Sequence, residues 1–524
     1  MKQFRKEPVL TWIILISLVI RGFVAATLEL GNDEVYYRTY ALFPQWSHFD
    51  HPPMVGWIIQ IFTLDLLLEH EFFIRLGAVF FGTANTWLIY ITAAKLKNRL
   101  AGLYAAFLYS VSLYFFIIAG LFILPDTPQV FFWLLSIYFL SELTVGKPGR
   151  RQSRAIILGG MAAGMAMLSK YTSAFIWLGA IVYVIFWKKY WLKRPALYIS
   201  IMISLLLFFP VVWWNIANDF GGILYHSGRV SLIDNGIRPD YLLMEVLGEI
   251  LYHNPFNVLI IVISITAFFR GNRFIKKDVF RYLLLTGLPV IAIFIGISLF
   301  RRTLPHWSGP GYISLLLIAS SWLAEKNRVT AGGSFRFLSS LRLKGSVFFL
   351  LTVIIIGYAQ IKTGIIPLGD SSNSTTTTLG KKDISLDLYG WKQIGRGFCE
   401  RIDRDTEAGI MPADPAVITY RWFPAAHLDY YVCRRCKCDV LTIGQLSSTH
   451  KYQSISEKRW DMQLGDHAYY LTTSRDYRHP SEVYASYFKD FEPADTIRVY
   501  RYGKHEMNAF IYRCLYLKVI PDYY

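Results

Sequence analysis

The sequence predicts a polytopic α-helical membrane protein that carries a small α/β domain at its C-terminal end. Of its 524 residues, 54% are hydrophobic and 17% are charged, and the mean hydropathy is +0.34. A soluble protein of this length carries a larger charged fraction. The apolar residues gather in runs close to the roughly 20 residues that cross a bilayer. The basic residues fall in alternate loops between these runs.

Eleven apolar runs are predicted to span the membrane. Some, such as 9–28, are nearly free of charge and close to full length, whereas 156–169 and 256–269 are short. No small-x-small cleavage site follows the first run, which favours a membrane anchor over a cleaved signal peptide. The predicted spans are 9–28, 72–94, 100–119, 127–143, 156–169, 173–187, 197–214, 256–269, 282–300, 311–324 and 346–361.

The basic residues predict the orientation of these spans. The net charge of +17 would suggest a nucleic-acid partner in a soluble chain. Here the lysines and arginines cluster before the first span and after each even-numbered span, while the other loops hold few. This positive-inside pattern places the N-terminus in the cytoplasm. An odd number of spans then places residues 362–524 outside, and no nucleic-acid partner is expected.

Composition divides the chain into three parts. Residues 1–361 form the membrane domain, whose first external loop, 29–71, is predicted to hold juxtamembrane helices. Residues 362–384 form a linker that is rich in Ser and Thr. Residues 385–524 are predicted to form an extracytoplasmic α/β domain. Its expected helices are 386–402, 422–432 and 481–488, its strands are 416–420, 439–443 and 468–472, and a hairpin joins 497–502 to 509–517.

All five cysteines lie beyond the last span. In an oxidising compartment they are candidates for structural disulfides. Cys433, Cys436 and Cys438 also resemble half of a zinc site, and free thiols are a third alternative. The pairing of Cys399, Cys433, Cys436, Cys438 and Cys514 stays open, but the odd number leaves at least one cysteine unpaired.

Asp33 and Glu34 follow directly on the first span and open a segment rich in tyrosine. This pattern fits a short helix in the membrane interface, anchored there by its tyrosines. Asp33 is a candidate general base for an incoming hydroxyl group. The structural alternative is that Asp33 caps the helix.

Two further acidic positions stand beside prolines. In Asp50-His51-Pro52-Pro53 the prolines make the backbone extended, so the segment is either a surface turn or a site for an acceptor, a phosphate or a divalent ion. Asp126 lies between two spans with almost no linker. Ionisable groups near membrane depth are usually functional, although Asp126 could also cap the next span.

Lys170, Arg301 and Arg302 are cations on the side that should lack them. Lys170 is either a snorkelling anchor or a ligand for a lipid-borne phosphate, and the paired arginines call for an anionic partner. Trp and Tyr residues at the same level suit the faces of sugars. Together with the acids, these residues favour the delivery of a sugar from a lipid phosphate to a hydroxyl group.

In their order and on one face, these motifs resemble the GT-C glycosyltransferases of the protein mannosyltransferase and aminoarabinose transferase superfamily. The bacterial glycosyltransferase family 39-like members are the most similar. The resemblance covers the membrane domain and is looser beyond it, where Leu388-Tyr389-Gly390-Trp391 is similar to the bacterial members. The motifs are Asp33-Glu34, Phe49-Asp50-His51-Pro52-Pro53, Pro125-Asp126-Thr127-Pro128, Ser169-Lys170-Tyr171-Thr172 and Pro305-His306-Trp307.

The resemblance implies a GT-C fold and a hexosyl- or pentosyltransferase that uses a polyprenyl (undecaprenyl) phosphate sugar outside the inner membrane. The acceptor would be a lipid such as lipid A, an envelope glycan or a protein. Asp33 would be the base, supported by Glu34 and Asp50. The expected phosphate ligands are Lys170, Arg301, Arg302, Tyr36 and His51, and the expected substrate contacts are Tyr37, Asp126, Tyr171, His253, His306 and Trp307.

Two departures from the aminoarabinose branch weaken a role in lipid A modification. Tyr36 and His51 stand where that branch has basic residues, a lysine in the second case. No cofactor is certain, although Asp50 and His51 are a possible pair of ligands for a divalent metal. Alternative functions are a flippase for lipid-linked glycans and a non-catalytic scaffold for envelope assembly.

Overall fold

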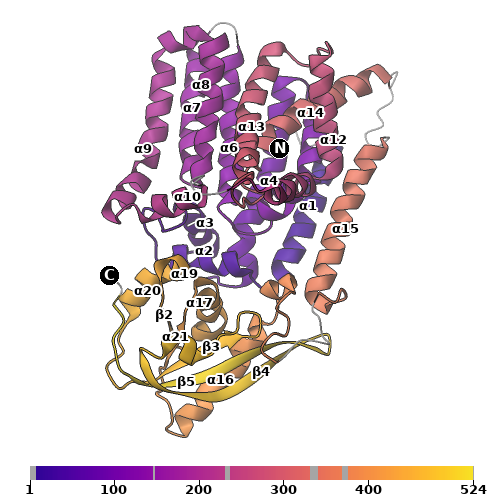
Figure 1. Ribbon diagram of the computed structural model, residues 1–524. Coiled ribbons are helices and arrows are strands. Elements are labelled where there is room, and N and C mark those ends of the chain that lie inside the picture. Colours follow the sequence, from indigo (N-terminus) through magenta and orange to yellow (C-terminus); the bar gives the residue numbers. More distant parts are fainter. Residues whose placement is uncertain (1–6, 146–147, 231–235, 331–339, 369–375, 523–524) are drawn as a thin grey trace. The chain divides into compact units, whose positions relative to one another are not determined.

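The computed structural model describes residues 7–145, 148–230, 236–330, 340–368 and 376–522. The chain forms two compact units (Figure 1). One comprises Met1–Ala26 with Pro44–Val353, and the other comprises Thr27–Phe43 with Ile354–Tyr524. The short segment that follows the first predicted span therefore belongs to the same unit as the C-terminal domain. The first unit is called the membrane unit below, and the second the C-terminal unit.

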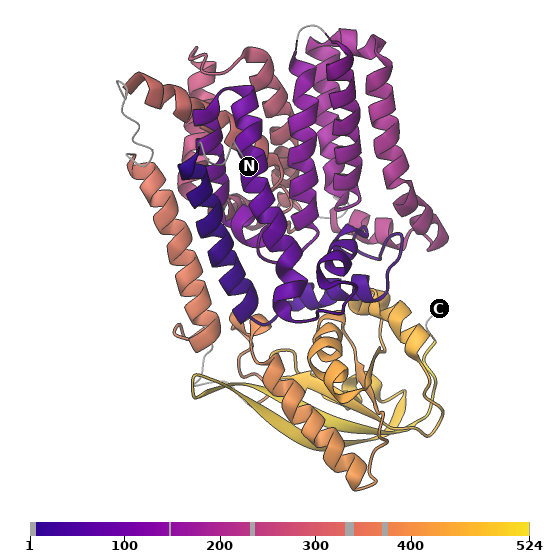
Figure 2. The same cartoon turned by 180° about the vertical axis from the view of Figure 1, so that it is seen from behind.

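The membrane unit is helical, and α6, α7, α8 and α9 stand side by side in both views (Figures 1 and 2). Pro at the first helical position favours the start of α9, α11 and α12. The helices are α1 (Pro8–Thr27), α3 (Met54–Thr63), α4 (Glu71–Leu96), α5 (Arg99–Ser110), α6 (Asp126–Leu140), α7 (Arg150–Met167), α8 (Phe175–Trp187), α9 (Pro195–Ala217), α10 (Gly221–Val230), α11 (Pro239–Tyr252), α12 (Pro255–Phe269), α13 (Lys277–Ser298), α14 (Gly311–Thr330) and α15 (Leu341–Thr363), the last of which continues into the C-terminal unit.

Ten of the eleven predicted spans fall on a helix of this series, whereas the predicted span 100–119 is divided between α5 and a separate π-helical turn at Tyr114–Ile118. Within the described residues, α1, α4, α9, α13 and α15 are individually long and apolar enough to cross a membrane. A sixth span is possible if α11 and α12, which meet at an angle of 96°, are counted as one. The polytopic helical class is thereby confirmed, and the full number of crossings stays a prediction.

Arg21 is a fully buried charge inside α1. Its Nε and Nη2 atoms donate to the carbonyls of Phe116 and Phe115, at 3.2 and 3.3 Å, and the guanidinium lies 4.4 Å from the Phe116 ring centre. These carbonyls belong to a π-helical turn, η2 (Tyr114–Ile118), where the regular α-helical ladder is interrupted. A charge within a span can mark a transport path; here backbone carbonyls accept from Nε and Nη2, and Nη1 is buried without a hydrogen-bond partner among the described residues.

The C-terminal unit is built on a five-stranded sheet of order β2-β1-β3-β5-β4. The three strands β2, β1 and β3 are parallel, and β5 and β4 continue the sheet in antiparallel fashion. This confirms the predicted α/β domain, including the closing hairpin, which is longer than expected. The strands are β1 (Ala416–Thr419), β2 (Asp439–Thr442), β3 (Ala468–Thr473), β4 (Phe488–Arg501) and β5 (Lys504–Leu517).

Alternation along β3 gives the sheet a core on each face. Tyr470 packs in one cluster with Tyr484 and Phe488. Its neighbour Tyr469 meets Phe398 of α16 on the other face, which α16 crosses (Figure 2). The remaining elements are α2 (Asn32–Leu42), η6 (Ile384–Leu388), α16 (Trp391–Glu407), α17 (Trp422–Leu428), η7 (Asp429–Cys433), α18 (Arg434–Cys436), α19 (Leu446–Thr449), α20 (Tyr452–Arg459) and α21 (Pro480–Tyr484).

The end of the predicted linker is fixed to the hairpin. Residues 369–375 lie outside the described residues, but Asp383 forms a buried ion pair with Arg501 of β4. Arg501 also donates to Ser385 Oγ at 2.8 Å and to the Gln360 carbonyl at 3.3 Å. The side chain of Arg501 thus links the end of α15, which contains Gln360, to the sheet.

Two disulfides stand in the C-terminal unit, Cys399–Cys436 and Cys433–Cys438, and Cys514 is buried and free. Of the alternatives left open by the sequence, the structure therefore has disulfides for four cysteines and a free thiol for the fifth. Cys399–Cys436 ties α16 to α18, and Cys433–Cys438 closes the turn after η7. The first links positions 37 residues apart and the second positions 5 apart.

Removing Cys399–Cys436 should destabilise the C-terminal unit more than removing Cys433–Cys438. Loop-closure entropy assigns about 4 kcal/mol to the longer loop and about 2 kcal/mol to the shorter one. We expect the double Ser variant of the first pair to show the larger fall in unfolding temperature by differential scanning calorimetry, with the second pair as the matched control. Equal shifts would contradict this expectation.

Candidate functional site

Asp33 and Glu34 open α2 in the C-terminal unit. The helix begins at Asn32 with Gly31 as its N-cap, and Glu34 Oε2 accepts from the Gly31 backbone N–H at 3.0 Å. Glu34 is buried, whereas Asp33 is exposed. The interpretation of Asp33 as the helix cap is therefore wrong, because Glu34 closes the first turn. The Asp33 carboxylate lies in the first turn of α2, at the positive end of the helix dipole.

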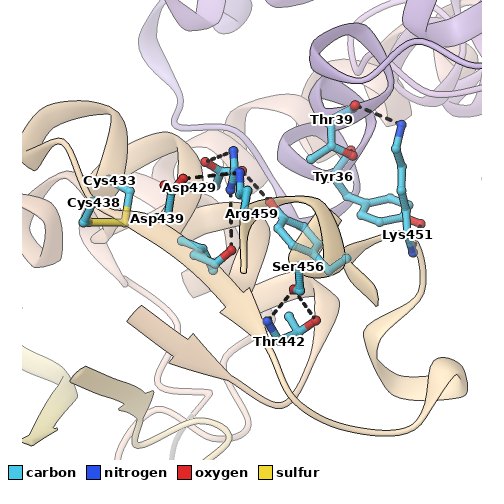
Figure 3. Close-up of polar contacts among 12 residues, drawn as sticks. Tyr36, Thr39, Asp429, Cys433, Cys438, Asp439, Thr442, Lys451, Ser456 and Arg459 are labelled. Carbon is cyan, nitrogen blue, oxygen red and sulfur yellow. Dashed lines mark hydrogen bonds and ion pairs between the residues drawn. A yellow bond between two sulfur atoms is a disulfide. The ribbon is translucent and has the colours of Figure 1, made fainter. Parts of the chain in front are cut away.

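The tyrosines of α2 are buried inside the C-terminal unit. Tyr36 and Tyr37 are 1% and 6% exposed, and the Tyr36 ring lies 4.8 Å from the ring of Trp422 in α17. Figure 3 shows Tyr36 beside Lys451, whose backbone N–H donates to Tyr36 Oη at 3.3 Å. The prediction that these tyrosines anchor the helix in the membrane interface is wrong. Aromatic partners within the unit cover them instead.

A buried ion pair joins Asp126 and Lys170 in the membrane unit. Lys170 Nζ lies 3.1 and 2.9 Å from the two carboxylate oxygens, and Tyr114 Oη donates to Asp126 Oδ1 at 2.9 Å. The residues are 3% and 6% exposed. The two charges neutralise each other inside the membrane unit. Asp126 is therefore not the cap of α6, and the side chain of Lys170 does not snorkel to a surface. A lysine has three donor hydrogens, so this geometry leaves capacity for a further acceptor.

Asp50 and His51 lie against α10. Asp50 is 8% exposed, and its carbonyl accepts from His226 Nε2. The His226 ring centre lies 5.6 Å from that of His51 and 5.2 Å from that of Tyr171. The interpretation as an exposed surface turn is thus wrong. The segment forms one aromatic and imidazole cluster with α10 and with the residue after Lys170.

Arg229, also on α10, is a cation that sequence reasoning did not select. Its guanidinium lies 4.7 Å from the ring of Trp307. Burial lowers the pKa of His51 well below its usual value, and His226, Lys170, Arg229 and His306 lower it further. His51 therefore lies within electrostatic range of the cations Lys170 and Arg229. Arg301 and Arg302 begin the loop that carries His306 and are half-buried and exposed, respectively.

The stability of the protein should fall in mild acid because of His306. Burial lowers the pKa of this histidine from 6.5 to about 4. Above pH 6.5 the histidine is neutral in both states. Between pH 6.5 and 4 the unfolded chain binds a proton that the folded chain does not, so stability is lost as pH falls. We expect a loss of about 1–2 kcal/mol at pH 5.

The thermal unfolding temperature in detergent, measured from pH 7.5 to 4.5, checks this expectation. A His306→Gln variant removes the titrating group and should show a shallower fall over the same range. Parallel curves for the two proteins would contradict the assignment.

A second polar cluster lies at the end of α11 and includes the predicted substrate contact His253. The His253 ring stacks on Tyr312 at 3.5 Å and lies 5.3 Å from Tyr114, the partner of Asp126. Tyr312 Oη donates to Glu249 Oε2 at 3.0 Å, and Ser308 donates to the other oxygen of Glu249. Neither His253 nitrogen has a hydrogen-bond partner among the described residues. The cluster therefore holds buried imidazole nitrogens without a partner among the described residues, close to Tyr114 and the ion pair.

No group of three or more His, Cys, Asp or Glu side chains within the described residues could hold a metal ion. Asp50 and His51 therefore lack the further side-chain ligands that a protein site for zinc requires.

One family model matches the chain. It is the model of dolichyl-phosphate-mannose-protein mannosyltransferase, and it covers residues 50–214. This range includes Asp50, His51, Asp126 and Lys170. No curated protein matches the sequence of this chain.

Two solved structures match along almost the whole chain. ArnT from Cupriavidus metallidurans in the apo state has a TM-score of 0.62 at 12% identity, covering 96% of this chain and 97% of that one. ArnT bound to undecaprenyl phosphate gives the same TM-score at 15% identity, with 96% and 98% covered. This protein has the GT-C glycosyltransferase fold. The GT-C resemblance drawn from the sequence motifs is confirmed, and the membrane unit and the C-terminal unit together make up this GT-C chain.

Proposed function

We propose that this protein transfers a single sugar from a polyprenyl-phosphate donor to a hydroxyl or phosphate acceptor at the outer face of the cytoplasmic membrane. The observation that carries this proposal is the buried Asp126–Lys170 pair, set among Arg229 and three histidines in a chain of GT-C fold. Lys170 keeps donor capacity beyond its bonds to Asp126, and Arg229 is an exposed cation, so both can meet an anionic ligand. A phosphate with a hydrophobic tail is an anion that a membrane protein of this fold can receive, and ArnT in the solved complex holds undecaprenyl phosphate.

In the proposed reaction, Asp33 removes the proton from the acceptor oxygen. That oxygen attacks the anomeric carbon of the sugar, the new glycosidic bond forms, and the bond from the carbon to the donor phosphate breaks. The polyprenyl phosphate leaves with the electron pair of that bond. Lys170 and Arg229 stabilise its developing charge, which is the largest electrostatic task of such a transfer. Attack opposite the leaving group inverts the anomeric centre.

The remaining candidates have supporting roles in this scheme. Glu34 holds the first turn of α2, and Asp50 supports the acceptor or the base. His51, Tyr36, Arg301 and Arg302 are proposed to contact the donor phosphate, although Tyr36 is buried against Trp422. The sugar is proposed to meet the His253 cluster, with Tyr37, Tyr171, His306 and Trp307 as further contacts. The acceptor class stays broad and includes lipids, envelope glycans and proteins.

The lipids of a strain that lacks the protein test this function. Loss of a transferase leaves its donor unused, so a polyprenyl-phosphate sugar should accumulate and one glycosylated envelope component should disappear. Restoring the wild-type gene should reverse both changes. A deletion strain with no accumulated donor and an unchanged set of glycosylated components would contradict the proposal.

A further inference from the structure

Helix α2 is held at its N-terminal end by three hydrogen bonds within the C-terminal unit. The Leu30 N–H donates to Tyr431 Oη at 2.7 Å, and Glu29 Oε2 accepts from the Trp391 N–H at 2.8 Å. His427 Nε2 donates to Asn32 Oδ1 at 2.8 Å. The His427 ring in turn stacks on Trp391 at 4.0 Å. This end of the helix is therefore fixed just before Asp33, by residues 362 to 401 positions away in the sequence.

The C-terminal end of α2 is held by Lys451. Its Nζ donates to the Thr39 carbonyl at 3.0 Å and to the Phe43 carbonyl at 2.7 Å, and it lies 4.7 Å from the Tyr40 ring centre. The last carbonyls of a helix have no partners within the helix, and a cation there also complements the dipole. Lys451 is 3% exposed. A buried ammonium group is stable here because these carbonyls accept its hydrogens.

The elements that hold α2 are themselves braced. Asp429 at the start of η7 pairs with Arg459, at 3.2 Å, and accepts from Tyr452 Oη at 3.0 Å. Figure 3 shows this network beside the Cys433–Cys438 disulfide and the Lys451 contact. An isolated helix of 11 residues is marginal in water. The position of α2 therefore depends on this braced surface.

We propose that Lys451 is a positioning residue that, together with His427 at the other end of α2, holds the helix in the orientation its Asp33 carboxylate needs for the transfer reaction. This inference rests on the proposed function, in which Asp33 is the base. Neither Lys451 nor His427 contacts the substrate in this scheme. Because Lys170 and Arg229, the two cations proposed to stabilise the donor phosphate, belong to the membrane unit, loss of Lys451 should lower kcat more than it raises the KM for the donor.

Lys451→Met tests the inference, because methionine keeps the unbranched length and removes the donor. A displacement of about 1 Å in a reacting group can cost about a hundredfold in rate, so we expect kcat to fall 10- to 100-fold. Amide hydrogen exchange over residues 35–43, measured by mass spectrometry, should become faster. The control is Lys458→Met, at an exposed lysine of α20, the helix whose N-cap is Lys451; it should change neither quantity.

His427→Phe gives a second test at the other end of α2, since phenylalanine keeps the ring stack on Trp391 and removes the bond to Asn32. If Lys451→Met does not fold, the His427→Phe variant tests the inference in its place. A folded Lys451→Met variant with wild-type exchange in residues 35–43, or with wild-type kcat, would overturn the inference. If the wild-type protein transfers no sugar at all, the proposed function has failed, and hydrogen exchange alone then decides whether Lys451 holds α2.

Discussion

Asp33→Asn should lower the transfer rate by about a thousandfold while the protein stays folded. A positioned general base contributes roughly 10²–10⁴ to a rate, and asparagine keeps the shape of the side chain but cannot take a proton. Asp33 is exposed at the start of α2, and Glu34 rather than Asp33 closes the first turn. The bond from the Gly31 N–H to Glu34 is therefore kept in the variant.

The measurement is the initial rate of transfer from a polyprenyl-phosphate sugar in detergent or proteoliposomes, beside the thermal unfolding temperature of the same preparation. Asp490→Asn, an exposed aspartate on β4 in the same unit, serves as the control and should keep full activity. Binding of the donor should persist in Asp33→Asn, since the base acts on the acceptor. Full transfer activity in this variant would remove Asp33 from the mechanism.

Lys170→Met should both destabilise the membrane unit and abolish binding of the donor phosphate. Removing one partner of a buried ion pair leaves an uncompensated charge, at a cost of about 3–5 kcal/mol. Here the stranded group would be Asp126, which is 3% exposed. A loss of activity in this single variant would therefore not separate a folding defect from a binding defect.

The double variant Asp126→Asn with Lys170→Met separates the two effects. It leaves no buried charge at this position, so the unfolding temperature should recover most of the loss. Binding of undecaprenyl phosphate, followed by tryptophan fluorescence, should stay absent. The Lys188–Asp278 pair, of which Asp278 is 39% exposed, is the matched control: its double variant should bind normally. Restored binding in the Asp126→Asn, Lys170→Met protein would contradict the role of Lys170.

Several site residues could be found from the sequence because they break a local rule. Lys170 is a cation where the positive-inside pattern expects few, and Asp126 is a carboxylate with almost no loop around it. The same reasoning could have selected Arg229, which also stands in a loop that is poor in basic residues. However, Arg229 has no motif around it that would indicate a functional role. Arg229 becomes a candidate only in the structure, where α10 brings its guanidinium over the ring of Trp307.

His226, Glu249 and Tyr312 could not be found in this way. Each lies on a helix where one polar residue among apolar ones is ordinary. Their significance comes from partners distant in sequence: His226 meets the Asp50 carbonyl, and Glu249 accepts from Ser308 and Tyr312. The alternatives at Asp33, Asp50, Asp126 and Lys170 were open for the same reason. A cap, a surface turn and a buried pair can share one local sequence.

The class of this protein, its many apolar helices and its C-terminal α/β domain could all be predicted from the sequence. These features depend on composition and on hydrophobic patterns that repeat every few residues. Both can be recognised within a short stretch of sequence. Only the tertiary structure decided that Lys170 pairs with Asp126 and that α2 belongs with the C-terminal unit, where Lys451 meets its last turn. The physical reason is that each of these contacts joins residues from 44 to 412 positions apart, and no local pattern records which distant partner neutralises a buried charge.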